Sequence, residues 1–534
     1  MAGGASCAAR LRRLDERAEI MMIERGPYVS FANCGLPYYV GGVIEKESSL
    51  LVASEELFRE RFRIGVRTRC EVTGIDREAK EVVVKDLRTG EETREGYDAL
   101  VLSPGASPIK PPLPGIDLPG IFTVRTIPDS REIKAWMEAK GARRAVVVGG
   151  GFIGLEMAEN FAHRGMEVTV VEMLDQVMPP LDREIAAIVE DHMRANGVKL
   201  SLGDGVAGFE SRDGGLAVLT ASGARHEADI VILAIGVRPD SALARGAGLH
   251  LNQRGGIRVD AQMRTSDPSI WAVGDAVEVT DFVLGKPTQI PLAGPANRQG
   301  RIAADAICGR ASKFRGVQGT AVCGVFRMAV AATGASEKAL VAAGVEGWEK
   351  VYLHPSSHAR YYPGAKPIAL KVIFRKEDGR ILGAQAAGLD GAEKRIDVIS
   401  AFLQMGGTVY DLEEAELCYA PQYGGAKDPV NFAGMIAADV LRGDMPLVHW
   451  DEPMAPETFL LDVRDPDEFE EGHAPDAVNI PLAQLRDRLG EIPAGKDVRA
   501  YCAVGLRGYI ATRILVQHGI PARNVSGGFL TKKK

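Results

Sequence analysis

Several features that would indicate other classes of protein are missing from this sequence. None of its apolar runs approaches the roughly 20 residues that a membrane-spanning helix needs, and the longest, such as 145–148 and 230–235, have the length of strands. Basic residues are not in excess, and the formal net charge of −7 argues against binding to nucleic acid. No positively charged segment leads into an apolar secretory signal. We therefore expect a cytoplasmic enzyme that has neither nucleic acid nor a membrane as a partner.

Cysteine and histidine are also scarce. The seven cysteines are odd in number and include no Cys-x-x-Cys pair, so we predict neither a disulfide framework nor a metal site. The chain would then work in a reducing compartment. The nine histidines are absent from the first part of the chain, where none precedes His163. With 534 residues, 46% of them hydrophobic, the chain is too long for one core and should form three or four domains.

One cysteine stands apart within residues 30–42, Ser-Phe-Ala-Asn-Cys-Gly-Leu-Pro-Tyr-Tyr-Val-Gly-Gly. Cys34 has no second cysteine close enough in sequence for a local disulfide. Gly35 and Pro37 form a turn that can begin a helix, and the N-terminus of a helix favours thiolate over thiol. The alternative is an inert cysteine in the core.

A complete dinucleotide-binding βαβ unit spans residues 144–172. Its strand 144–148 leads into a Gly-x-Gly-x-x-Gly turn and a helix, and a second strand, 167–171, ends at an acid. Such glycines allow a tight turn and a close approach of the pyrophosphate, and the acid accepts from a ribose hydroxyl. Because Glu172 would repel a 2′-phosphate, we expect NADH to be preferred over NADPH. The predicted NAD-binding residues are Gly149, Gly151, Ile153, Gly154 and Glu172.

The start of the chain matches only the second half of such a unit. Gly3, Gly4 and Ala5 lead into a helix, and a strand ends at Glu24. The first strand and first glycines are absent, and we expect that the protein begins some ten residues upstream. Two further strands, at 97–106 and 229–240, each end in a turn of small residues, and a third ends at Gly274 and Asp275.

The order of these motifs resembles that of flavoprotein reductases with two dinucleotide-binding domains, over about residues 2–440. The Cys34 segment is similar to the branch of coenzyme A (CoA)-disulfide reductases, NADH oxidases and NADH peroxidases. The resemblance implies an α/β protein with two Rossmann-like domains: an FAD-binding domain (1–110 and 238–318), which lacks its first strand, and an NAD-binding domain (111–237). It implies FAD contacts from Gly3, Gly4, Ala5, Glu24, Arg25, Ser103, Gly105, Gly236, Gly274, Asp275 and Ala293.

Within this branch, the oxidases and peroxidases carry a histidine in the first helix, where this chain has arginines. Arginine suits the phosphates of CoA. Together with the matching motif, this favours CoA binding by Arg13, Ser30 and Asn33. The alternative is a solvated basic face.

Residues 319–443 resemble the α+β dimerisation domain of the family and imply a homodimer. Two segments resemble those that carry tyrosines into the partner subunit's active site in CoA-disulfide reductases. Tyr361 and Tyr419 fit best, with Tyr362 and Tyr423 as neighbouring alternatives. Their role would be to protonate a leaving thiolate, and the alternative is aromatic packing at an interface.

After a predicted linker at 444–456, residues 457–534 resemble an α/β rhodanese domain. Its loop contains Cys502, Gly505 and Arg507, and backbone N–H groups of such a loop favour an anionic sulfur. A phosphatase-like loop is the competing interpretation. Four residues separate Cys502 from Arg507, which makes the loop tighter than a phosphatase loop and favours a persulfide carrier.

The sequence as a whole predicts an FAD-dependent, NADH-driven reductase of CoA disulfide, CoA persulfide or polysulfide, with Cys34 as redox cysteine. An NADH oxidase that cycles through a Cys34 sulfenic acid and a non-catalytic binding protein are the alternatives.

Overall fold

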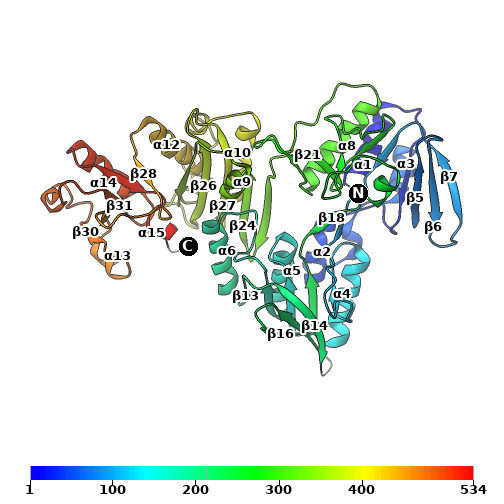
Figure 1. Cartoon of the computed structure of the whole chain (residues 1–534), viewed down its shortest axis with the longest axis horizontal. Coiled ribbons are helices and arrows are strands. Elements are labelled where there is room, and N and C mark those ends of the chain that lie inside the picture. The colour runs from blue at the N-terminus through cyan, green and yellow to red at the C-terminus, as the bar shows by residue number, and fades with distance from the viewer. Residues whose placement is uncertain (1, 213–214, 533–534) are drawn as a thin grey trace. The chain divides into compact units, whose positions relative to one another are not determined.

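The computed structural model describes residues 2–212 and 215–532 (Figure 1). The chain forms two compact units. Unit 1 contains Met1–Met178 and Arg194–Gly319, and unit 2 contains Pro179–Met193 and Thr320–Lys534.

Part of unit 1 is built on a parallel five-stranded sheet in the order β10-β17-β11-β12-β13. Its central strand and one neighbour of that strand lie where the sequence predicts them, because runs of valine buried on both faces suit a parallel sheet. An antiparallel sheet β14-β15-β16 accompanies it. The elements are β10 (Ile121–Phe122), α4 (Ile127–Lys140), β11 (Arg144–Val148), α5 (Phe152–His163), β12 (Glu167–Val171), β13 (Lys199–Ser201), β14 (Val206–Arg212), β15 (Gly215–Thr220), β16 (Arg225–Ala228) and β17 (Ile230–Leu233).

The other part of unit 1 has only short ladders at its centre. Strand β1 pairs with β4 and β8 pairs with β20, both in parallel, and in the described residues no ladder joins these two pairs. Helix α1 packs along α8 beside them. The helices are α1 (Ala2–Leu14), α2 (Leu36–Gly41), α3 (Glu55–Phe62), α7 (Ala242–Gly246) and α8 (Ala293–Ile307), with short 3-10 turns η1 (Asn33–Gly35) and η2 (Glu47–Leu50).

The strands of this part are β1 (Met21–Glu24), β2 (Ser30–Phe31), β3 (Leu51–Ala53), β4 (Gly65–Thr68), β5 (Cys70–Asp76), β6 (Glu81–Asp86), β7 (Glu92–Gly96), β8 (Leu100–Leu102), β9 (Ala106–Pro108), β18 (Val237–Pro239), β19 (Ile257–Arg258), β20 (Ile270–Ala272), β21 (Val277–Thr280) and β22 (Pro287–Thr288).

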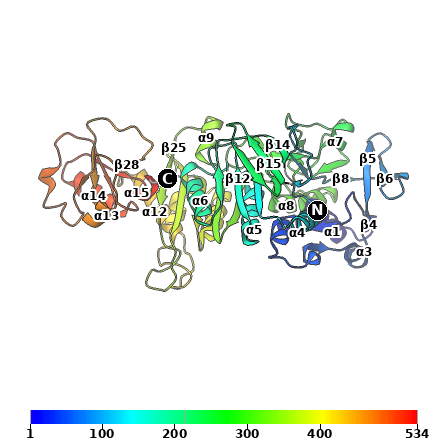
Figure 2. The same ribbon diagram turned by 90° about the horizontal axis from the view of Figure 1, so that it is seen from below.

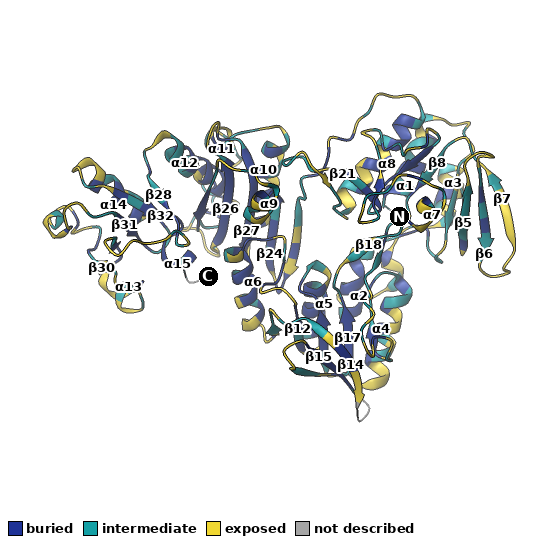
Figure 3. Ribbon diagram, in the orientation of Figure 1, coloured by how far each residue is buried: buried dark blue, intermediate teal, exposed yellow. Residues whose placement is uncertain are grey.

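Unit 2 contains an antiparallel sheet in the order β23-β24-β27-β26-β25. Strands β26 and β27 are buried along almost their whole length (Figure 3). Helix α10 packs on β24 and β27, and α12 packs on β25 and β26. The elements are α6 (Arg183–Ala195, grouped with this unit up to Met193), β23 (Ala321–Val325), β24 (Met328–Gly334), α9 (Glu337–Ala343), β25 (Trp348–Leu353), β26 (Ile368–Arg375), β27 (Ile381–Gly388), α10 (Ala392–Gln404), α11 (Val409–Glu413) and α12 (Pro429–Arg442).

A second sheet of unit 2 is entirely parallel, in the order β28-β32-β31-β29-β30, and its strands lie together at one end of the unit (Figure 2). We call residues 445–532 the C-terminal module. Its elements are β28 (Leu447–Val448), β29 (Phe459–Asp462), α13 (Pro466–Glu470), β30 (Val478–Asn479), the 3-10 turn η3 (Leu489–Glu491), β31 (Val498–Tyr501), α14 (Leu506–Gln517), β32 (Ala522–Val525) and α15 (Gly528–Lys532).

Strand β28 corrects the predicted linker at 444–456. Leu447 and Val448 pair with Asn524 and Val525 of β32, and Val448 is fully buried. Prolines around this short strand gave the segment the composition of a linker, but its apolar residues complete the edge of a sheet.

No helix within residues 2–212 and 215–532 is both long enough and apolar enough to cross a membrane.

Candidate active site

Cys34 lies in the turn η1, directly before α2, as the sequence predicts. Its side chain is exposed. Helix α2 packs against α4 and α5 of the predicted NAD-binding domain. Tyr38, one helical turn after Cys34, donates from its hydroxyl to Glu156 Oε1 of α5 at 3.5 Å. The thiol therefore lies near a carboxyl group that sequence reasoning missed.

The electrostatics at Cys34 differ from the expectation of a thiolate favoured by a helix. Burial, and then the carboxylates of Glu156 and Asp275, raise the pKa of Cys34, and the backbone hydrogen bond only partly opposes them. A six-residue helix does not offset burial together with two nearby acids. Burial also raises the pKa of Glu156 to about 7, so this carboxyl can hold a proton beside the thiol near neutral pH.

The Gly149–Gly154 turn has the shape that a dinucleotide pyrophosphate requires. Gly149 has φ +110°, and a side chain at Gly154 would lie 2.0 Å from the Gly149 carbonyl oxygen. The space beside Gly151 is open to 4 Å, at the N-terminus of α5 where phosphates bind. These residues fit a bound nicotinamide dinucleotide, with Ile153 exposed in the first turn of α5.

Glu172 closes β12 beside this turn. Its carboxylate accepts from the N–H groups of Gly150 at 2.6 Å and Leu174 at 2.9 Å. It thus places a fixed negative charge at the turn, where an added phosphate would meet repulsion.

The start of α1 is also tightly packed. A side chain at Gly3 would lie 2.8 Å from Val273 Cγ2, and one at Gly4 would lie 2.3 Å from Ser103 Oγ. This close approach of helix and strand ends fits an FAD-binding domain.

The other predicted FAD residues lie in the same part of unit 1. Burial raises the pKa of Asp275, which follows β20. The Glu24 carboxylate accepts from Gly26 N–H at 2.7 Å, and the Arg25 guanidinium pairs with Glu71 and Asp240. Gly105, Gly236 and Gly274 have positive φ, Ala5 packs in the cluster around Ala8 and Phe58, and Ala293 begins α8.

The arginines of α1 divide into two groups. Arg10 pairs with Asp305, and the buried Arg12 donates to four backbone carbonyls of residues 15–16 and 62–63. Arg13 is exposed, whereas Ser30 is buried in β2 and Asn33 opens η1. Of these three arginines, Arg13 is therefore the one whose exposed side chain is available to contact a ligand.

In unit 2 the structure brings together the two tyrosines that the sequence singles out. The hydroxyls of Tyr361 and Tyr419 hydrogen-bond at 2.5 Å, and the side chains are 76% and 48% exposed. This hydrogen bond raises the pKa of Tyr361. Of the alternatives, Tyr362 packs its ring against His358, and Tyr423 is exposed.

Cys502 follows β31 and precedes α14, and its side chain is 0% exposed. The Gly505 N–H donates to Cys502 Sγ at 3.2 Å, and Gly505 has φ +103°. Arg507 donates to both carboxylate oxygens of Glu468. Its pKa is raised first by Glu468, with a further contribution from Cys502. The loop thus directs a backbone N–H toward one buried sulfur, and the Arg507 guanidinium, held by Glu468, acts on that sulfur electrostatically.

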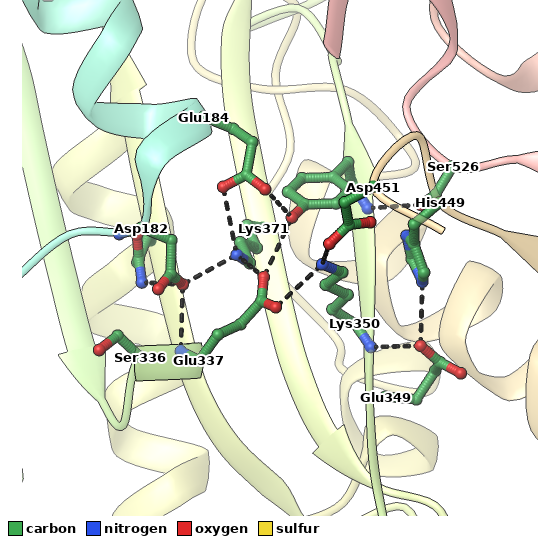
Figure 4. Close-up of polar contacts among 12 residues, drawn as sticks. Asp182, Glu184, Ser336, Glu337, Glu349, Lys350, Lys371, His449, Asp451 and Ser526 are labelled. Atoms are coloured by element: carbon green, nitrogen blue, oxygen red, sulfur yellow. Dashed lines mark hydrogen bonds and ion pairs between the residues drawn. The ribbon is translucent and has the colours of Figure 1, made fainter. Parts of the chain in front are cut away.

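A buried ionic network joins the C-terminal module to the antiparallel sheet, and Figure 4 shows its members. Lys371, 0% exposed on β26, is in ion pairs with Asp182, Glu184 and Glu337. Lys350 on β25 binds Glu337 at 2.9 Å and also Asp451 of the module at 3.0 Å.

Two further contacts extend this network, which we call the docking network. His449 Nε2 lies 3.0 Å from Glu349 Oε1, and the Tyr352 N–H donates to Ser526 Oγ at 3.1 Å. Burial alone would raise the pKa of Glu349, but its bonds to His449 and to Lys350 N–H hold it at about 2. The C-terminal module is therefore fixed on the sheet rather than tethered to it.

Comparison with known proteins agrees with this geometry. Residues 2–300 match the family model of pyridine nucleotide-disulphide oxidoreductases, residues 320–428 match the dimerisation domain of that family, and residues 448–531 match rhodanese-like domains. The chain belongs to the pyridine nucleotide-disulphide oxidoreductases and carries a C-terminal rhodanese domain. It is an FAD-dependent oxidoreductase that uses a nicotinamide nucleotide, and the predicted family and fold class are confirmed.

Individual proteins of known sequence or structure are similar to this chain. The chain is similar over nearly its whole length to the reduced CoADR-RHD of Bacillus anthracis (49% identity, TM-score 0.97, 99% of this chain and 96% of that one). It is likewise similar to a NAD-dependent persulfide reductase from A. fulgidus (39%, TM-score 0.93, 99% and 98%). The coenzyme A disulfide reductase of Staphylococcus haemolyticus is 33% identical over 441 residues (82% of this chain, 98% of that protein). An NADH oxidase of Methanocaldococcus jannaschii is 35% identical over 447 residues (83% and 97%).

Proposed function

We propose that the chain is an NADH-driven reductase of CoA disulfide, CoA persulfide or polysulfide, with Cys34 as its single redox cysteine. The observation that carries this proposal is the place of Cys34. Its exposed thiol lies near Glu156 of the predicted NAD-binding domain and Asp275 of the predicted FAD-binding domain, which supports a place between the two proposed nucleotide sites. The similarity to named disulfide and persulfide reductases supports the same substrates.

The Cys34 thiolate would attack one sulfur of the substrate S–S bond. That bond breaks, a mixed disulfide with Cys34 forms, and one thiolate leaves. Two electrons and a proton then cleave the mixed disulfide, which releases the second thiol or sulfide and restores Cys34. Bound FAD would supply the relay of the two electrons from NADH. Glu156 can hold the proton that Cys34 loses.

The tyrosine pair would protonate the leaving thiolate. Tyr361 and Tyr419 are exposed and share a hydrogen bond, so one hydroxyl can donate while the other supports it. In a homodimer they would act in the partner subunit's active site. Arg13, Ser30 and Asn33 would bind CoA, and Glu172 would make NADH the better donor.

The rhodanese domain would carry sulfur as a persulfide on Cys502. The Gly505 N–H and the guanidinium of Arg507 would stabilise the anionic sulfur.

Turnover of NADH with CoA disulfide, CoA persulfide and polysulfide tests the reductase proposal. We expect faster oxidation of NADH with at least one of them than in air alone. The similarity to an NADH oxidase supports a second candidate, in which oxygen is the acceptor and Cys34 cycles through sulfenic acid. Undiminished NADH consumption in air without any disulfide would favour the oxidase.

A further inference from the structure

The two segments that carry Tyr361 and Tyr419 need a support, because neither tyrosine lies in a helix or strand. Tyr361 is in the connection between β25 and β26, and Tyr419 is in the connection between α11 and α12. Exposed loops are mobile unless other residues tie them down, yet the two hydroxyls lie at hydrogen-bond distance.

Arg395 of α10 lies beneath both segments and is 2% exposed. Its Nη2 donates to the Ser357 carbonyl at 2.7 Å, four residues before Tyr361. The same guanidinium binds the Asp428 carboxylate through Nε at 3.2 Å and Nη2 at 2.8 Å. Asp428 ends the second segment and caps α12. One buried guanidinium therefore fixes the root of one tyrosine segment and the end of the other.

The segments are also bonded to each other above this ion pair. The Ala359 N–H donates to the Gly424 carbonyl at 2.9 Å. A side chain at Gly424 would lie 3.5 Å from Asp428 Oδ2 and 3.9 Å from Arg395 Nη2, so the crossing of the segments packs on the Arg395–Asp428 pair. The start of the second segment is held by Asn431, whose Nδ2 donates to the Ala415 carbonyl at 2.8 Å.

We propose that Arg395 and Asp428 are positioning residues that hold the Tyr361 and Tyr419 hydroxyls together. This proposal rests on the proposed function of the two tyrosines. The planar fork of Arg395 reaches a carboxylate and a carbonyl at once, and a lysine has no such fork. Arg395→Lys therefore keeps the buried charge and removes the two-point support.

The experiment uses the FAD-loaded full chain. In Arg395→Lys we expect kcat for disulfide reduction to fall roughly 10- to 100-fold, with an unchanged rate of flavin reduction by NADH. The Tyr361 hydroxyl should also titrate at lower pH, because its hydrogen bond to Tyr419 weakens. Tyrosinate absorbance, compared with and without an added Tyr361→Phe change, measures this titration. The matched control is Arg375→Lys. Arg375 makes a similar two-point pair with Asp378, but on the surface of the antiparallel sheet on which α10 packs. This variant should change neither turnover nor the Tyr361 titration.

The two proposals fail in distinguishable ways. If Tyr361→Phe with Tyr419→Phe leaves disulfide turnover unchanged, the catalytic role of the tyrosines is wrong, and the titration of Tyr361 still decides whether Arg395 positions it. If the double tyrosine variant is slow but Arg395→Lys keeps both wild-type turnover and wild-type titration, the positioning proposal is overturned. Asp428→Asn is the second variant should Arg395→Lys fail to fold, because asparagine still caps α12 and weakens the ion pair. It should show the same two changes, and wild-type values in it would overturn the proposal.

Discussion

Two cysteines of this chain occupy the same local position, after a strand and before a helix, in opposite environments. Cys34 has an exposed side chain, and partial desolvation of its sulfur, followed by two carboxylates, raises its pKa. Cys502 is fully buried, and its sulfur accepts from a backbone N–H near a guanidinium. The difference shows that the strand–turn–helix pattern sets the position of a thiol but not its surroundings: Cys502 is surrounded by residues of its own loop, whereas Cys34 lies near acids from distant segments. An exposed thiol suits exchange with dissolved disulfides, and a buried sulfur that accepts a backbone hydrogen bond suits storage of a persulfide.

The largest expected effect separates the roles of the two cysteines. Cys34→Ser should lower NADH-dependent reduction of every sulfur substrate by at least about 10³-fold, because the attacking thiol is lost. Cys502→Ser should spare reduction of CoA disulfide and impair only donors that must first load the rhodanese domain. Steady-state assays of both variants with both substrate classes check this. Wild-type use of every persulfide and polysulfide donor by Cys502→Ser would contradict the proposed role of the rhodanese domain.

The docking network gives the next largest effect, on the module that contains Cys502. Lys350→Met should leave Glu337 without one charged partner and should destabilise unit 2 by about 2 kcal/mol. Thermal unfolding and limited proteolysis around residues 443–457 would measure this, and CoA disulfide reduction by Cys34 should persist. Arg488→Met removes an exposed ion pair with Glu491 and serves as the control. Equal stability of the two variants would show that Lys350 contributes little to docking.

A smaller effect tests the acids around Cys34. Glu156→Gln should lower the Cys34 pKa and speed its alkylation several-fold near neutral pH, because one of the two carboxylates that oppose the thiolate is removed. Burial remains as the first cause of the raised pKa, so the shift should be partial. Alkylation rates of the FAD-loaded protein over a pH series measure the change. A pH profile of alkylation equal to that of the wild type would show that the Glu156 charge does not affect the Cys34 pKa.

The same variant has a second consequence for pH dependence. The Glu156 carboxyl has a pKa of about 7 in the folded chain, above its ordinary value of 4.5, so the folded state binds the extra proton between these values. Its contribution to stability is therefore lost as pH rises from about 4.5 to 7. In Glu156→Gln this decline should disappear, which denaturant unfolding at pH 5 and pH 8 would reveal.

The smallest effect concerns the loop of Cys502. Glu468→Gln should remove one of the carboxylates that pair with Arg507. The positive charge of the guanidinium should then act more strongly on the Cys502 sulfur. We expect roughly threefold faster alkylation of Cys502, since the Arg507–Glu468 pair is partly exposed. Mass spectrometry of the labelled peptide measures this rate. Slower alkylation would mean that Glu468 serves mainly to orient Arg507.

The sequence predicted those parts of the fold and site whose residues act locally. Strands 144–148 and 167–171 were predicted with the observed bounds, because glycine turns and runs of valine leave few other conformations. The position of Cys34 before a helix was predicted for the same reason. The assignment of Tyr361 and Tyr419 to one site came from the family resemblance and not from their spacing.

Long-range features were not predicted. Glu156 looks like an ordinary polar position of α5, and only the packing of α2 on α5 brings it near Cys34. The members of the docking network come from six separate segments, and in the sequence alone each member looks like an ordinary solvent-exposed polar residue. The burial of Arg395 likewise could not be predicted, because about half of the residues of its helix are polar. The helix before which Cys34 lies does not by itself set the pKa of its thiol, because burial, and then the carboxylates of Glu156 and Asp275, raise it.

The short strand β28 has a consequence for how the molecule moves in solution. Helix α12 ends at Arg442 and β28 begins at Leu447, so only residues 443–446 connect them. Even these are held, since Arg513 donates to the Asp444 carbonyl and the Asn524 N–H to that of Pro446. A connection of this length, whose backbone is hydrogen-bonded, does not allow the rhodanese domain to rotate relative to the dimerisation domain. The rhodanese domain should therefore tumble with the dimerisation domain as a single body, and its rotational diffusion should be that of the larger particle.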